Sequence, residues 1–198
     1  MTSRESRLSR RVRLLVAATI TYNVVEAVVA ITAGSSASST ALIGFGLDSV
    51  IEVASAAAVA WQFSGSEPEA RERTALKIIA VSFFALAVYV AVEAIWSLAG
   101  GTPAGHSTAG IVLAAVSLLV MPVLSYAQRR AGRQLGSASA VADSKQTLLC
   151  TYLSGVLLVG LLLNSLFGWY WADPLVALVI AAVAVREGRE AWRGDECC

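Results

Sequence analysis

Charged side chains and cysteines are both scarce in this 198-residue chain. Charged residues make up 15% of the sequence, against roughly 25% in a soluble domain, and are too few to coat a globular surface. Three cysteines, two of them at the end of the sequence, predict no disulfide framework. The formal net charge of +1 gives no reason to expect a nucleic-acid partner. A water-soluble globular domain is therefore excluded as the fold class.

The sequence is instead rich in long apolar runs: 57% of its residues are hydrophobic, and its mean hydropathy is +0.68. A run of about 20 residues can cross the hydrocarbon core as a helix. We therefore predict one all-α transmembrane domain over residues 1–198, a bundle of six helices in the lipid bilayer. The expected spans lie near residues 14–33, 40–63, 76–99, 111–127, 138–166 and 174–192, and the last has the shortest uninterrupted apolar part, 174–185.

Lysine and arginine predict the orientation, because cytoplasmic loops carry an excess of both. They cluster before the first predicted span, between the second and third, between the fourth and fifth, and after the sixth. Fourteen of the fifteen thus fall on one side of a six-span topology, and Lys145 lies inside a span. Both termini are expected in the cytoplasm, in a multi-pass protein of the cell (inner or plasma) membrane. The first run is longer than a secretory signal core and has no convincing cleavage site, so we expect it to be retained.

Six ionisable residues fall at membrane depth, where each is costly and is a functional candidate by default. They are Glu26, Asp48, Glu52, Glu93, Asp143 and Lys145. Five acids cannot all be neutralised by one base. Either several are protonated, or they face water, or a cation supplies the missing charge.

Spacing narrows these candidates to two helices. Asp48 and Glu52 are four residues apart, as are Gln146 and Cys150, so each pair shares one helical face. At 1.5 Å per residue, Asp48 and Glu52 lie ~12 and ~18 Å from the outer end of their span. Gln146 and Cys150 lie ~12 and ~18 Å from the inner end of theirs. Because the two spans are antiparallel, we expect Asp48 level with Cys150 and Glu52 level with Gln146, near mid-membrane.

Carboxylates and a thiolate suit zinc or another thiophilic divalent ion better than magnesium or calcium. Glutamine is a poor zinc ligand, so Gln146 could act through water or orient another ligand. The competing interpretation is a set of interhelical hydrogen bonds that only hold the bundle together. An acidic pair at i and i+4 fits that interpretation poorly, because like charges repel.

These residues resemble the cation diffusion facilitator family of six-span divalent-metal transporters. The segment 34–42 followed by Asp48 and Glu52 resembles the family's second-span motif, in which a Ser/Gly-rich entry leads to two ligands four apart. Asp143 resembles the Asp of the fifth-span motif, and the segment 169–175, an aromatic turn followed by Asp-Pro-Leu, resembles the start of the sixth span. Gln146 and Cys150 replace the family's usual His and Asp. We expect a short branch that keeps the transmembrane domain without the C-terminal cytoplasmic domain; the resemblance also implies a homodimer.

The remaining polar residues in the spans have two interpretations each. Asn23 and Glu26 either make packing contacts or serve the second shell or access path of the site. Lys145 is expected chiefly as an ion-pair partner of Asp143, Glu26 or Glu93, with a role in coupling as the alternative. Asp143 is a possible accessory carboxylate. The role of the terminal Cys197 and Cys198 is left open.

The sequence predicts a zinc-like divalent-cation transporter that moves its substrate out of the cytoplasm by alternating access with proton exchange. Predicted metal ligands are Asp48, Glu52, Gln146, Cys150 and Asp143, with the metal as transported substrate rather than cofactor. A non-transporting scaffold or subunit is the alternative, as is transport of iron, manganese or cadmium. No nucleophile–base pair or phosphate-binding glycine loop is present, so neither enzymatic activity nor a catalytic residue is expected.

Overall fold

Six α-helices make up the computed structural model, which describes residues 3–62, 68–100, 103–135 and 138–193. They are α1 (Ser3–Ala37), α2 (Thr40–Gln62), α3 (Pro68–Leu98), α4 (Thr108–Leu135), α5 (Ala138–Phe167) and α6 (Ala172–Arg193). No strand occurs in these ranges. The all-helical bundle predicted from the apolar runs is confirmed.

Two helices extend beyond the apolar runs 14–33 and 111–127. α1 continues through residues 34–36 to Ala37, and α4 continues through residues 129–134 to Leu135. In α1 the Ser35 and Ser36 hydroxyls donate to carbonyls four residues back, at 2.7 and 2.9 Å, and so fit the helix. The helix ends where Ser38 takes a positive φ of 52°, a conformation that terminates helices.

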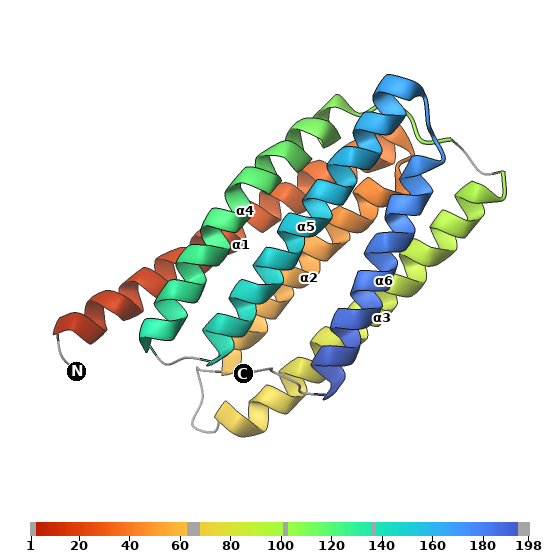
Figure 1. The fold of residues 1–198 in the computed structure, drawn as a ribbon. Helices are drawn as coiled ribbons and strands as arrows, with labels where there is room; N and C mark the ends of the chain where they lie inside the picture. Colours follow the sequence, from red (N-terminus) through yellow and green to blue (C-terminus); the bar gives the residue numbers. More distant parts are fainter. Residues whose placement is uncertain (1–2, 63–67, 101–102, 136–137, 194–198) are drawn as a thin grey trace.

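The helices form two groups that meet at α2 (Figure 1). α4 packs most extensively against α5, α1 against α2, and α3 against α6. α2 contacts α1, α3, α5 and α6, and together with a smaller contact between α5 and α6 it links the α3–α6 pair to the rest of the bundle. Its side chains Leu42 and Phe45 are fully buried in the apolar core. Any polar residue on the inner face of α2 is therefore held at the centre of the protein.

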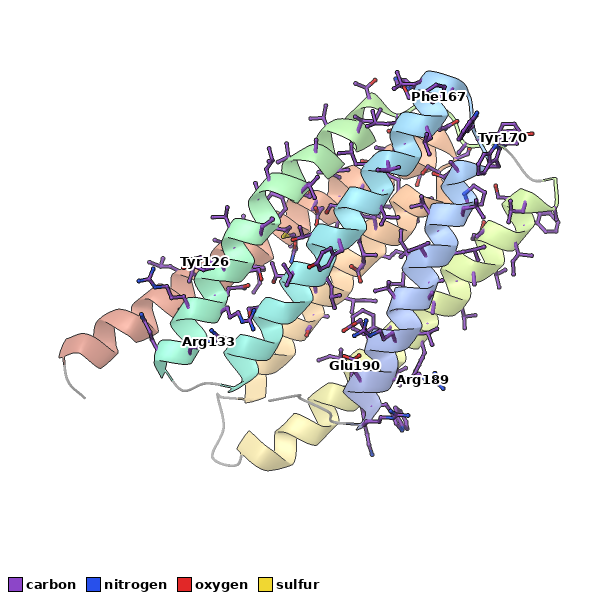
Figure 2. All side chains as sticks on the ribbon, viewed as in Figure 1. Tyr126, Arg133, Phe167, Tyr170, Arg189 and Glu190 are labelled. Carbon is purple, nitrogen blue, oxygen red and sulfur yellow. The ribbon has the colours of Figure 1, made fainter. Side chains whose placement is uncertain are left out.

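The two ends of the bundle differ in chemistry. Figure 2 shows Arg133, Arg189 and Glu190 toward the end at which α1 begins and α6 finishes, and Phe167 and Tyr170 at the opposite end. Near Phe167, the rings of Trp169 and Trp171 stack with centroids 5.1 Å apart. Aromatic rings are enriched at membrane–water interfaces. A basic end and an aromatic end match the charge asymmetry of the sequence, with both termini on the same side.

Five of the described helices contain a stretch long and apolar enough to cross a membrane, namely residues 17–37, 40–57, 77–98, 108–131 and 147–167. α6 does not qualify, because Arg186, Glu187, Arg189 and Glu190 fall in its last two turns. Its apolar part nevertheless lies along α3, and Ala177, Ile180 and Ala181 are buried. The sixth helix is thus confirmed, with the short apolar part that the sequence indicates, and its role as a sixth membrane span stays a prediction.

The α1–α2 hairpin is packed too closely for larger side chains. A Cβ atom added at Gly46 would lie 2.8 Å from Ile31 Cγ1 and 3.0 Å from Ala30 Cβ. One added at Gly34 would lie 2.9 Å from the Ile43 backbone nitrogen. Small residues at such crossings let helix backbones approach each other in a membrane. This approach positions the inner faces of α1 and α2 against each other.

We expect Gly46→Ala to destabilise the fold by about 1–3 kcal/mol, because the added methyl group overpacks the contact with α1. Gly155→Ala is the matched control, because its new Cβ would meet only Leu118 Cδ1, at 3.7 Å. Helix propensity predicts a neutral or stabilising effect of up to about 1 kcal/mol there. Melting temperatures of both purified variants in one detergent test this; equal shifts would contradict it.

Hydrogen bonds to the Asp173 carboxylate join the start of α2 to α6 near the aromatic end. The Ser39 hydroxyl donates to one carboxylate oxygen of Asp173, and the other oxygen accepts the Ala41 amide at 3.3 Å. Ser39 and Asp173 are both buried. A carboxylate at a helix N-terminus satisfies free amides and complements the helix dipole. Asp173 therefore fixes the start of α2 relative to α6.

Candidate cation site

Glu26 of α1 lies at the centre of a buried polar cluster that four helices build. Its Oε2 accepts the Ser49 hydroxyl of α2 at 2.8 Å, and its Oε1 accepts the Ser117 hydroxyl of α4. The Cys150 thiol of α5 donates to Oε2 with 3.9 Å between sulfur and oxygen. Glu26 is 1% exposed. One carboxylate thus collects donors from three neighbouring helices.

Cys150 lies where the acidic residues converge. The residue is 2% exposed, and Glu52, Glu26 and Asp48 lie within electrostatic range of its thiol. Its backbone carbonyl accepts the Ser154 hydroxyl at 2.7 Å. A buried thiol in contact with a carboxylate is a plausible ligand for a soft divalent cation.

Asp48 and Glu52 differ in burial although they share one face of α2. Glu52 is 2% exposed, whereas Asp48 is half-buried and interacts electrostatically with Glu26 and with Glu187 of α6. The two carboxylates therefore line the inner face of α2 at successive turns. Asp48 interacts with acids of α1 and α6, and Glu52 with the Cys150 thiol.

Of the residues singled out in the sequence, the structure brings Glu26 and Cys150 into contact, and it places Asp48 and Glu52 within electrostatic range of that thiol. The side chains of Asp143, Lys145 and Gln146 lie outside the described residues, as do Cys197 and Cys198. Asn23 is buried on α1, one turn before Glu26. Glu93 is exposed on α3 and makes no part of the cluster.

The described acids and thiol do not form a closed chelate. Among the side chains that the structure describes, no three of the types His, Cys, Asp and Glu are close enough together to hold a metal ion. The Glu26 carboxylate contacts the Cys150 thiol, with 3.9 Å between oxygen and sulfur. Closing a site around an ion would require side-chain rotation or a small relative movement of the helices.

Sequence reasoning missed the hydroxyl groups of the cluster. Ser49 and Ser117 hold the two oxygens of Glu26, and the Tyr22 hydroxyl lies 2.8 Å from the Ser117 hydroxyl. Serine and tyrosine are common in transmembrane helices and carry no charge that would single them out. The only available signal was position, because Ser49 directly follows Asp48 and Tyr22 lies four residues before Glu26.

Comparison with known proteins assigns this bundle. The model of the family described as the cation efflux transmembrane domain matches residues 16–193, which is nearly the whole chain. The chain belongs to the cation efflux family. Its described helices and its five apolar span candidates are consistent with a multi-pass membrane protein of this transporter family.

Two curated relatives share part of the sequence. The cation-efflux pump FieF of Shewanella oneidensis is 32% identical over 80 residues, which cover 40% of this chain and 27% of that protein. The uncharacterized transporter sll1263 of Synechocystis sp. is 26% identical over 150 residues, or 71% of this chain and 48% of that protein. The matched part of this chain thus covers about half of the length of sll1263 and 27% of the length of FieF.

Proposed function

We propose that this protein exports a divalent metal ion, zinc or a similarly thiophilic cation, from the cytoplasm. The observation that carries the proposal is the buried contact between Glu26 and the Cys150 thiol, at 3.9 Å, with a further buried acid, Glu52, on α2. Such an excess of acid at membrane depth calls for a compensating cation. Carboxylates combined with a thiolate favour zinc-like ions. Membership of the cation efflux family supports transport as the role of this site.

In this proposal Asp48, Glu52 and Cys150 ligate the ion directly. Gln146 ligates or orients, Asp143 assists, and Asn23, Glu26 and Lys145 belong to the second shell or the path. Alternating access would arise as the α3–α6 pair and the rest of the bundle move relative to each other about α2. We further propose a homodimer in the cell membrane, with both termini in the cytoplasm.

Proton exchange follows from the ligand chemistry. A thiol and carboxylates bind metal in their deprotonated forms, so binding releases protons and weakens as pH falls. The same groups can then take up protons after the metal has left. The ligand set itself provides a physical route to exchange metal for protons.

The test is metal binding by the purified full chain, compared with Asp48→Ala and Cys150→Ser. We expect the wild type to bind zinc with measurable proton release and both variants to lose affinity at unchanged melting temperature. Isothermal titration calorimetry in two buffers of different ionisation enthalpy gives affinity and released protons together. Equal binding by all three proteins would contradict the assigned site.

The scaffold alternative makes a different prediction in cells. If the polar residues only pack helices, Asp48→Asn and Glu52→Gln would change stability and leave zinc tolerance of the host unaltered. Loading the purified protein with iron, manganese and cadmium in competition with zinc addresses the second alternative, another transported ion.

A further inference from the structure

Helix α1 carries two buried polar side chains that the ligand set above does not use. Glu26 and Asn23 are each 1% exposed and lie three residues apart on the face that also buries Thr19 and Ala30. Residues three or four apart share a helical face. Both side chains therefore lie on the inner side of α1, which packs against α2 and α4.

Asn23 is buried without any hydrogen-bond partner. Neither its Nδ2 nor its Oδ1 has one among the residues that the structure describes. Buried amide groups are nearly always satisfied, and an exception calls for an explanation such as an ion or water that belongs there. Its amide oxygen, like that of Gln146, is a weak ligand for zinc that can bind the ion directly or through a water molecule. The unsatisfied amide of Asn23 therefore indicates that an ion or a water molecule belongs there, one turn from Glu26.

The spacing of Glu26 and Cys150 matches two ligands of one tetrahedral ion. With Zn–O of about 2.0–2.2 Å and Zn–S of about 2.3 Å, tetrahedral geometry separates the oxygen and the sulfur by about 3.6 Å. The observed separation is 3.9 Å. A shift of a few tenths of an ångström would let both atoms contact one cation, with the thiol proton leaving as the metal binds.

Glu26 also has the surroundings of a metal-ligating carboxylate. Ligating carboxylates are themselves held by hydrogen bonds that fix their orientation. Here Ser49 holds Oε2 and Ser117 holds Oε1, while Tyr22 hydrogen-bonds to the Ser117 hydroxyl. These donors are uncharged, so they orient the carboxylate without neutralising it. The negative charge remains for a cation.

We propose that α1 supplies ligands to the transported cation, with Glu26 bound directly beside Cys150 and the Asn23 amide oxygen completing the coordination in one state of the cycle. The inference rests on the proposed function and extends it from two helices to three. It makes α1 an element that determines which metal is accepted, rather than a passive support of the bundle.

The test uses the full chain in nanodiscs, with zinc affinity and the absorption spectrum of bound Co²⁺ as readouts. We expect Glu26→Gln to weaken zinc binding by at least about 100-fold, more than the typical loss of an outer-shell partner. Glu26→His, which places another metal ligand at position 26, is expected to restore binding with a changed Co²⁺ spectrum. Asn23→Leu is expected to weaken binding by at least about 10-fold, in the range of lost coordination contacts.

Because Glu26 also links three helices, Ser117→Ala serves as a second variant that keeps the carboxylate and removes one of its donors. A loss of about 10–100-fold in zinc affinity is expected, at a melting temperature close to that of the wild type. Wild-type affinity and an unchanged Co²⁺ spectrum in both Glu26→His and Ser117→Ala would overturn the role of α1. If Glu52→Gln abolished zinc binding while those two variants kept wild-type affinity, the proposed function would stand without the role of α1. A wild-type protein that binds no divalent metal would contradict both the proposed function and the role of α1.

Discussion

Replacing Glu52 with glutamine is expected to abolish zinc transport while the six-helix fold is retained. The substitution keeps the shape of the side chain and removes one negative charge from a position that is 2% exposed and acts on the Cys150 thiol. Loss of an outer-shell partner typically weakens metal binding 10–100-fold, so loss of a charged ligand is expected to cost at least about 100-fold. Zinc uptake into inside-out proteoliposomes measures the effect.

Glu93→Gln is the matched control for this experiment. It makes the same chemical change at a predicted membrane depth, on the exposed face of α3 and outside the cluster. Near wild-type transport is expected, since the charge that is removed does not face the proposed ion path. Equal loss of transport in the two variants would show that transport depends on total membrane acidity or folding, and would remove the reason for placing the ion between α2 and α5.

The helices could be predicted because apolar runs of about 20 residues have few alternatives to a helix in lipid. The ends of the helices could not be predicted in this way, because hydropathy reports membrane depth rather than helical hydrogen bonding. Arg129 and Arg133 are polar yet good helix formers, so α4 extends past them to Leu135. The serines after Gly34 likewise remain helical, and only the positive φ of Ser38 ends α1.

The cluster was predictable in part for a related reason. Charge at membrane depth identified Glu52, Cys150 came from spacing and depth matching, and the structure places both in the interior. Contact between Glu26 and Cys150 was not predictable, since it depends on how closely α1 approaches the centre. That approach is set by small residues such as Gly46, whose missing side chain has no signature in a hydropathy profile. Glu26 was accordingly expected only in a supporting role.

Replacing Cys150 with serine is expected to change which metal the protein prefers. Serine keeps the size of the side chain and exchanges a soft sulfur for a hard oxygen, so binding of zinc and cadmium falls more than binding of manganese. An affinity loss of at least about 100-fold for cadmium is expected, again above the range for outer-shell partners. Competition titrations with the three metals on wild type and variant measure the ratio of affinities.

Thr151→Val provides the control on the same helix, because its hydroxyl donates to the Thr147 carbonyl, at 3.3 Å. The order of metal affinities is expected to stay that of the wild type. If Cys150→Ser lowered all three affinities by one common factor, the sulfur would serve packing rather than selection. A shift of the ratio toward manganese is the result expected of direct contact between sulfur and metal, because a soft sulfur ligand favours cadmium and a hard oxygen favours manganese.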